Sequence, residues 1–336
     1  MVGREIPFSL AINESIRSEM RRDPNVILMG EDVAGGAGRE DFVDAWGGAF
    51  ATYKGLITEF GPERVRDTPI SETGFIGAAV GAAATELRPV VELMFVDFVG
   101  VCLDQLMNNA AKMRYMFGGK IEMPLTVLTY CGAAGGNAAQ HSQSLYSLFV
   151  HLPGLKCVAP SDAYTAKGLI ISAIRDNDPV IVFIHKGILG RKAEVPEEDY
   201  TLPIGKAMVG REGADVTLVG ISSMTGVCLK AAEELAKGGI NAEVIDLLSL
   251  SPMDEDTILQ SVQKTQRLVV VDEDTPRCSM ATDIAALVAD KAFDYMDAPI
   301  KRVTAPHTPV PFSSVLEKAY VPDVAKVVAT VKSLWS

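Results

Sequence analysis

Glu72 is the first side chain in this sequence whose type and setting suit acid–base chemistry. It is a lone carboxylate at the start of ETGFIGAAVGAA, a run of small and apolar residues. Burial among apolar neighbours favours a protonated carboxyl, whereas a helix N-terminus favours the carboxylate. Glu72 therefore suits a group that holds or shares a proton. The alternative is a helix-capping acid beside a tight helix crossing, with Gly77 and Gly81 on the close face.

His141 and Phe98 are the other two candidates. His141 follows the small-residue stretch CGAAGGNAAQ after an expected strand, where α/β folds place ligands, and an imidazole can donate a proton near neutral pH. Phe98 follows an apolar run, and an aromatic ring there can stack on a flat ligand. The alternatives are a structural histidine and a core phenylalanine. Ser142 does not indicate a hydrolase, because the chain has no G-x-S-x-G motif.

The elements that must position these residues alternate between strands and helices. Continuously apolar strands separated by helices are typical of a parallel sheet covered on both faces. The expected strands are 26–32, 89–95, 125–130, 155–160 and 179–185. The expected helices are 8–22, 73–86, 97–116 and 162–176.

A second alternation follows a charged segment that begins at residue 186. Its expected strands are 216–222, 242–250, 267–273 and 300–306, and its expected helices are 225–238, 254–264, 278–292 and 323–335. Ser251 is the expected N-cap of the 254–264 helix, with Pro252 at the first helical position. The sequence therefore predicts an α/β domain at 1–190, a linker with a short β element at 191–212, and a smaller α/β domain at 213–336.

Composition excludes several classes of protein. A chain of 336 residues is long for a single core, and its net charge of −12 argues against nucleic acid as a partner. No apolar run reaches the length of a membrane helix, and MVGREIPFSL has no signal-peptide pattern. The five cysteines are scattered without a CxxC motif, so we expect a reducing cytoplasm. The high apolar content favours subunit interfaces over a bilayer.

The Gly-rich segment AGGAGREDFVDAWGG at 34–48 is not a nucleotide-binding motif. It contains neither G-x-G-x-x-G nor a P-loop. It is read as a long surface loop, or as a loop at a cofactor channel or interface.

Several long motifs together identify a family. The chain resembles, from about residue 4 to 335, the β subunits of the thiamine-diphosphate-dependent first enzyme of 2-oxo acid dehydrogenase complexes. The resemblance is carried, in order, by MGEDVAGGAG, TPISETGFIGAAVGAA, LRPVVELMFVDF, AAQHSQS, HLPGLKCVAPSDAYTAKGLI, AIRDNDPVI and RVTAPHTPVPF. It implies a transketolase-type pyrimidine-binding domain followed by a transketolase C-terminal-type domain. MGEDVAGGAG, DAWGG, MFVDF, RYMFGGK and SPMDEDTI look most like acetoin dehydrogenase β subunits.

The resemblance assigns roles to individual residues. Glu72 matches the glutamate that hydrogen-bonds N1′ of the aminopyrimidine of thiamine diphosphate. Phe98 matches the aromatic residue beside that ring, and Ile70 and Met94 match apolar positions near it. His141 matches the active-site histidine that assists proton transfer and meets the lipoyl group.

The resemblance also implies metals and partners. Ala173, Asp176 and Asp178 match positions that hold a potassium ion in some members. No GDG motif occurs, and the only NN pair is Asn108-Asn109. The diphosphate and Mg²⁺ must then be held mainly by an α subunit in an α2β2 heterotetramer, which serves a lipoyl-bearing acyltransferase core.

The implied reaction cleaves acetoin to acetaldehyde and a hydroxyethyl–cofactor intermediate, which acetylates the lipoyl group. The alternatives are a pyruvate or branched-chain 2-oxo acid dehydrogenase β subunit and, from another class, a non-catalytic docking subunit. The segment HKGILGRK departs from the family pattern. Relatives usually carry an acidic residue where Ile184 stands and a bulkier run where Gly187 and Gly190 stand.

Overall fold

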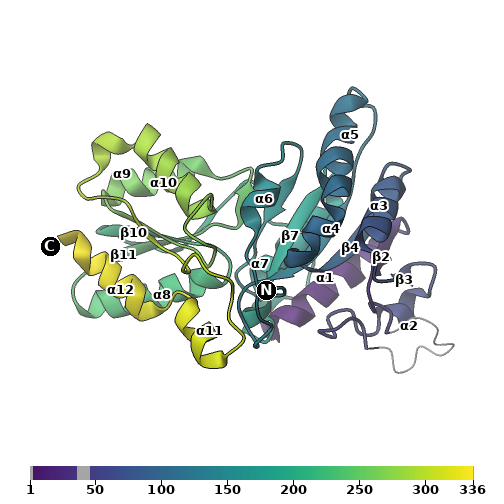
Figure 1. Ribbon diagram of the computed structural model, residues 1–336, viewed down its shortest axis with the longest axis horizontal. Coiled ribbons are helices and arrows are strands. Elements are labelled where there is room, and N and C mark those ends of the chain that lie inside the picture. The colour runs from purple at the N-terminus through teal and green to yellow at the C-terminus, as the bar shows by residue number, and fades with distance from the viewer. Residues whose placement is uncertain (1–2, 36–45, 336) are drawn as a thin grey trace. The chain divides into compact units, whose positions relative to one another are not determined.

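A computed structural model describes residues 3–35 and 46–335 of the chain (Figure 1). Residues 36–45 of the Gly-rich segment therefore lie outside the described residues. The chain forms two compact units. Unit 1 comprises Met1–Cys131, Phe149–Ile184 and Ile188–Ile204. Unit 2 comprises Gly132–Leu148, His185–Gly187 and Gly205–Ser336.

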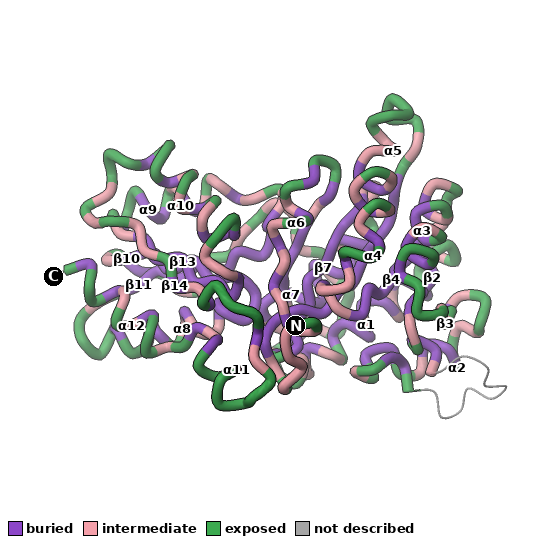
Figure 2. Tube along the Cα trace, viewed as in Figure 1, coloured by how far each residue is buried: buried purple, intermediate pink, exposed green. Residues whose placement is uncertain are grey.

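Unit 1 is built on a sheet with the strand order β6-β7-β5-β4-β2-β3. The β2–β3, β2–β4, β4–β5 and β6–β7 pairs are parallel. These strands are β2 (Val26–Gly30), β3 (Val65–Asp67), β4 (Arg88–Phe95), β5 (Thr126–Cys131), β6 (Lys156–Val158) and β7 (Val180–His185). All residues of β2, β5 and β7 are buried, as their apolar sequences predict for strands covered on both faces (Figure 2). The predicted parallel α/β fold is confirmed.

Helices and a two-stranded ribbon complete unit 1. The helices are α1 (Phe8–Arg22), α2 (Leu56–Phe60), α3 (Glu72–Ala83), α4 (Val99–Asp104), α5 (Ala111–Met116) and α7 (Ala163–Arg175). α1 packs against α7 and α3 packs on β4 and α4. β1 (Gly3–Pro7) and β8 (Lys192–Pro196) form an antiparallel ribbon.

The expected single helix at 97–116 is interrupted. A 3₁₀ turn at Val96–Phe98 leads into α4, a π-helical segment at Gln105–Ala110 follows, and α5 completes the run. The Asn109 side chain donates to the Asp104 carbonyl at 3.3 Å, and Asn108 donates to the Asp104 carboxylate at 2.6 Å. Side chains that bond backbone carbonyls compete with the helical ladder, which accounts for the widened turn.

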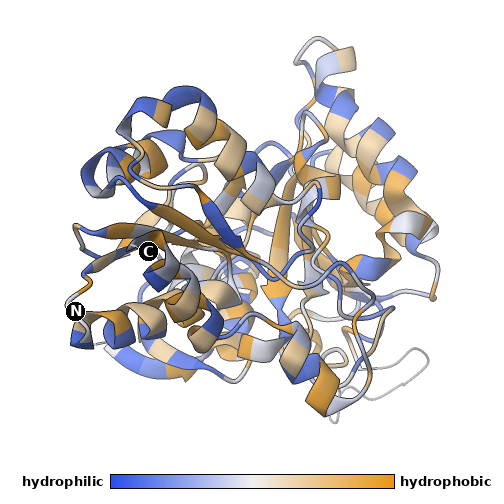
Figure 3. Ribbon diagram, turned by 60° about the vertical axis from the view of Figure 1, so that its left-hand side comes forward, coloured by the Kyte–Doolittle hydropathy of each residue, from blue (hydrophilic) through white to orange (hydrophobic). Residues whose placement is uncertain are grey.

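Unit 2 contains a second sheet with the order β14-β13-β10-β11-β9, parallel except for β9. Its strands are β9 (Met208–Arg211), β10 (Val216–Gly220), β11 (Ala242–Asp246), β13 (Leu268–Val271) and β14 (Lys301–Val303). Figure 1 shows α9 (Glu255–Thr265) and α10 (Met280–Lys291) on one side of this sheet, and α8 (Ser223–Lys237) and α12 (Val324–Lys332) on the other. The three central strands β10, β11 and β13 are buried along their whole length, as strands covered on both faces must be, and orange segments run through the strands in Figure 3. The short helices α6 (Tyr146–Val150) and α11 (Ser314–Tyr320) were not expected from the sequence.

The predicted cap of α9 is wrong. The segment Ser249–Ser251 forms the short strand β12, and α9 begins at Glu255. Asp254 caps it instead, because its carboxylate accepts from the Thr257 amide at 3.4 Å and from the Thr257 hydroxyl at 2.9 Å. The Ser249 hydroxyl donates to the Pro252 carbonyl at 2.7 Å, which holds the chain in a turn ahead of the helix.

The expected linker at 191–212 is shared between the units. β8 pairs with β1 inside unit 1, and β9 pairs with β11 inside unit 2. The short β element expected there is thus two strands. Among the described residues, no helix combines the length and the apolar character that crossing a membrane requires.

Candidate functional site

Glu72 opens α3 and is only 7% exposed. Its carboxylate accepts no hydrogen bond from any described side chain or amide. Glu31, directly after β2, lies close enough that its pKa is raised by burial first and by the Glu72 charge second. Burial and then the same charge raise the pKa of the Cys102 thiol on α4 to about 12. Glu72 is therefore a nearly buried acceptor between the end of β2 and the helices α3 and α4.

The expected ring-binding residues lie on elements tied to that helix start. Met94 is buried at the end of β4, and Phe98 is half-buried just before α4. The Phe98 ring stands edge-on to Phe95, with centroids 5.7 Å apart, so part of its surface packs in the protein. The Thr73 hydroxyl donates to the Val101 carbonyl, which ties the first turn of α3 to α4.

Ile70 differs from the other three. It is 84% exposed on the loop before α3, although isoleucine is among the residue types most often buried. Core packing of unit 1 does not account for it. The role that the sequence assigns to Ile70 beside a ligand stays a prediction.

His141 belongs to unit 2 and is half-buried on the loop that follows β5. Its backbone carbonyl accepts a hydrogen bond from the Lys186 ammonium. The same ammonium is 3.3 Å from the Ser142 hydroxyl, and the Gly132 amide donates to the Gln143 carbonyl at 3.1 Å. The imidazole thus stands on a loop whose backbone is held from within the unit.

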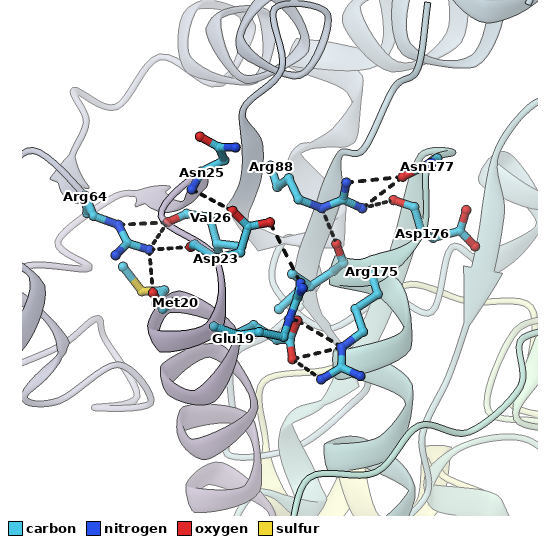
Figure 4. Close-up of polar contacts among 12 residues, drawn as sticks. Glu19, Met20, Asp23, Asn25, Val26, Arg64, Arg88, Arg175, Asp176 and Asn177 are labelled. Carbon is cyan, nitrogen blue, oxygen red and sulfur yellow. Dashed lines mark hydrogen bonds and ion pairs between the residues drawn. The ribbon is translucent and has the colours of Figure 1, made fainter.

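The predicted potassium positions are surrounded by cationic side chains. Arg88 donates to the carbonyls of Ile174 at 2.9 Å and Asp176 at 2.6 Å, and to the Asn177 side chain at 3.2 Å (Figure 4). The Ala173 carbonyl accepts from the Asp176 amide at 3.2 Å. Carbonyl oxygens are the ligands a hard cation prefers, and here a guanidinium already contacts two of them.

The two carboxylates of this region are paired as well. Lys156 lies 2.8 Å from both carboxylate oxygens of Asp176 and 3.0 Å from Asp178, and Arg114 lies 2.5 Å from Asp178. Burial opposes ionisation of Asp178, but the two cations outweigh it and lower its pKa. The described residues contain no cluster of three His, Cys, Asp or Glu suited to a metal ion. Potassium at Ala173, Asp176 and Asp178 stays a prediction, and it would compete with these ion pairs.

A buried carboxyl that the sequence analysis missed is Glu92 in the middle of β4. Burial raises its pKa to about 8, partly offset by the nearby Tyr53 and Tyr130 hydroxyls. The Tyr130 hydroxyl is 2.8 Å from that of Thr52. A charged residue inside the apolar run PVVELMF was the signal available in the sequence.

A second missed group lies in unit 2. The His185 Nε2 is 2.8 Å from Glu273 Oε2, and both residues are buried. Neighbouring acids are also perturbed. Burial raises the pKa of Asp272 to about 6, and burial followed by the Asp272 charge raises that of Asp274 to about 8. The sequence gives no spacing that would pair His185 with a residue 88 positions later.

Comparison with known proteins agrees with this architecture. The family model for the transketolase pyrimidine binding domain matches residues 4–192, and that for the transketolase C-terminal domain matches residues 205–327. Among solved structures, a split-gene transketolase described as an inactive β4 tetramer superimposes with a TM-score of 0.76 at 22% identity, covering 96% of each chain. A transketolase from Campylobacter jejuni gives 0.71 at 14% identity, covering 98% of this chain and 47% of its own. These two likenesses establish the fold.

Curated relatives carry the comparison further. The acetoin:2,6-dichlorophenolindophenol oxidoreductase subunit β of Bacillus subtilis is 57% identical, covering 99% of this chain and 98% of its own. That of Cupriavidus necator is 54% identical over 98% of both chains. The pyruvate dehydrogenase E1 subunit β of Rhizobium meliloti is 45% identical over 96% of this chain and 68% of its own. The resemblance drawn from the motifs is confirmed, and the chain belongs to the family of thiamine-diphosphate-type E1 β subunits that includes these oxidoreductases and pyruvate dehydrogenases.

Proposed function

We propose that this chain is the β subunit of an acetoin dehydrogenase. It would act with an α subunit to cleave acetoin to acetaldehyde and to pass the remaining two-carbon unit to a lipoyl group. The observation that carries the proposal is the near full-length identity of 57% and 54% to two acetoin:2,6-dichlorophenolindophenol oxidoreductase β subunits. Pyruvate dehydrogenase β subunits match at 42% to 45%.

The residues of unit 1 fit the aminopyrimidine half of thiamine diphosphate. Glu72 offers a nearly buried carboxylate that no described group hydrogen-bonds, and Met94 and Phe98 offer an apolar wall. Thiamine diphosphate, when bound, supplies the carbon nucleophile and the electron sink of the reaction. Glu72 would bind the ring nitrogen N1′ and share a proton with it. Its nearly buried position suits this task, because few other groups compete for the carboxylate there.

His141 is proposed to move a proton at the reacting centre and to meet the lipoyl group. An imidazole can both donate and accept a proton, which is what this role requires. His141 is half-buried on a loop whose backbone accepts a hydrogen bond from Lys186. This position suits such a role, because the backbone is fixed while part of the residue stays exposed.

Partners follow from the same reasoning. The names of the relatives describe β subunits, and no GDG motif occurs in this sequence. We therefore infer an α2β2 assembly in which the α subunit holds most of the diphosphate and Mg²⁺. The assembly would deliver its product to a lipoyl-bearing acyltransferase core.

The test is a substrate comparison with the reconstituted α/β pair. Acetoin, pyruvate and 3-methyl-2-oxobutanoate are offered at equal concentrations with 2,6-dichlorophenolindophenol as electron acceptor. We expect acetoin to have the highest kcat/KM. A tenfold preference for either 2-oxo acid, about 1.4 kcal/mol in the barrier, would overturn the acetoin assignment. Assembly without turnover of any substrate would instead favour a docking subunit.

A further inference from the structure

Lys186 is a buried lysine beside the proposed catalytic histidine. It is 8% exposed and stands directly after β7, in a segment that belongs to unit 2. Its ammonium donates to the His141 carbonyl and lies 3.3 Å from the Ser142 hydroxyl. Burying an ammonium is costly unless its donors are used, so these contacts have a structural or functional purpose.

The loop that Lys186 contacts has little rigidity of its own. CGAAGGNAAQ consists mainly of Gly and Ala, and Gly132, Gly135, Gly136 and Ala138 all have positive φ. Such residues lose much conformational freedom on folding and have no long side chains to hold them. The Gly136 amide is held by Glu317 at 3.0 Å, well ahead of the histidine. Lys186 contacts the backbone of the histidine itself.

The backbone of segment 185–187, which carries the Lys186 side chain, is held in place by the His185 side chain. The Gly187 amide donates to His185 Nδ1 at 3.1 Å, so Nδ1 is an acceptor and Nε2 carries the proton. Nε2 then donates to Glu273, whose other oxygen accepts from the Ala133 amide at 2.5 Å. The start of the histidine loop and the segment 185–187 are therefore joined through one carboxylate.

Gly132 is required by this packing, and Gly187 eases it. A Cβ on Gly132 would lie 2.0 Å from His185 Nε2, and Gly132 also has a φ of +88°. A Cβ on Gly187 would lie 3.1 Å from the His185 ring and 3.3 Å from the Ala134 Cβ. The absence of a side chain at Gly187 thus eases the close approach of segment 185–187 to the loop.

We propose that Lys186 is a positioning residue for His141. By binding the His141 carbonyl and the Ser142 hydroxyl, it fixes the backbone from which the imidazole projects, and hence the direction of the ring. The inference rests on the proposed function, in which His141 transfers a proton. It explains why an ammonium is buried here.

Lys167 provides a matched control. It is 1% exposed, and its ammonium donates to the carbonyls of Pro196, Glu197 and Glu198 at 2.9 to 3.0 Å. It is therefore also a buried lysine that holds backbone carbonyls, but it belongs to unit 1 and contacts no residue of the histidine loop. Lys167→Met removes the same chemistry from a place without the proposed role.

The test is a double-mutant cycle in the reconstituted α/β complex, with acetoin and 2,6-dichlorophenolindophenol. His141→Ala keeps the backbone carbonyl that Lys186 binds, so it removes the ring alone. We expect Lys186→Met to lower kcat at least tenfold with KM changed less than threefold. In the His141→Ala background it should lower kcat less than twofold further, because no ring remains to position. Lys167→Met should change kcat by the same factor in both backgrounds.

Hydrogen exchange of the full chain is the second measurement. Lys186→Met should speed amide exchange in residues 132–145, and Lys167→Met should speed it near 196–198 instead. If Lys186→Met does not assemble, Lys186→Arg replaces it, and we expect this variant to retain kcat within fivefold because a cationic donor remains.

The outcomes separate the inference from the proposed function. An equal loss of kcat on Lys186→Met with and without the His141 ring would overturn the positioning role. Full activity of His141→Ala would overturn the catalytic role of His141. If His141→Ala is fully active, unchanged exchange at 132–145 in Lys186→Met would also refute the contact between Lys186 and the loop. Faster exchange would show that Lys186 only stabilises the loop, and the positioning role would again be wrong.

Discussion

Replacing Glu92 with glutamine tests whether the buried carboxyl of β4 is neutral in the folded chain. Burial raises its pKa from an ordinary 4.5 to about 8. Below pH 4.5 the carboxyl is protonated in the folded and in the unfolded state, so it does not make the free energy of unfolding depend on pH. Between pH 4.5 and 8 the folded state holds a proton that the unfolded state has released, so stability falls as pH rises. The total loss is on the order of 5 kcal/mol, at about 1.4 kcal/mol per pH unit.

Glu92→Gln keeps the shape of the side chain and can still accept from the tyrosine hydroxyls, but it does not titrate. We expect the stability difference between variant and wild type to shift in favour of the variant by about 2–3 kcal/mol from pH 6 to pH 8. Asp272 and Asp274, whose pKa values burial also raises, contribute equally to both chains and cancel in the comparison.

The measurement is urea unfolding of the full chain at pH 6, 7 and 8, read by pulse labelling of buried thiols. Cys131, on the β5 strand that pairs with β4, reports on unit 1. Cys228 in α8 reports on unit 2 and is the internal control, because Glu92 lies outside that unit. Parallel pH profiles for Cys131 in variant and wild type would refute the reasoning, since they would show that Glu92 is ionised in the fold.

Three further predictions concern the site. Glu72→Gln in the α/β complex should lower kcat by roughly 10²–10⁴-fold, the usual worth of an acid–base group, and turnover within threefold of wild type would leave Glu72 a structural role. The isolated chain should bind thiamine diphosphate with Mg²⁺ more weakly than micromolar in calorimetry, because no GDG motif is present, and sub-micromolar binding would contradict a shared site. Lys156→Met removes the ammonium between Asp176 and Asp178, so exchanging NaCl for KCl should raise its melting temperature more than that of wild type. An equal potassium effect in both chains would show that Lys156 and the ion do not compete.

Most of the fold was predictable because its strands are continuously apolar. VILMG and VIVFIH are buried along their whole length, and such short runs rich in Val and Ile between longer helical patterns favour strands. β3 was missed because VRD is three residues long and only one of them is fully buried. The break at 105–110 was missed because the Asn109 side chain bonds a backbone carbonyl of the helix, a contact that leaves the apolar spacing of the run intact.

A site residue could be predicted from the sequence only where the features that mark it lie in one short stretch. Glu72 stands out because a helix start and an apolar run occur in one stretch. Lys186 does not, because its partner lies 45 residues earlier in the chain. His185 and Glu273 are 88 residues apart, and only the fold of unit 2, to which both belong, brings them together.

The position of Lys186 also bears on the choice of donor substrate. A 2-oxo acid carries a carboxylate that a cationic donor would stabilise, whereas acetoin is neutral and needs none. Lys186 is the cation placed beside the His141 loop, but its ammonium binds a backbone carbonyl and approaches a serine hydroxyl of that same loop. Recruiting it to a substrate carboxylate would remove this donor from the His141 carbonyl. The contacts of Lys186 within unit 2 therefore favour a neutral substrate. Turnover of a 2-oxo acid would require a cation from the α subunit.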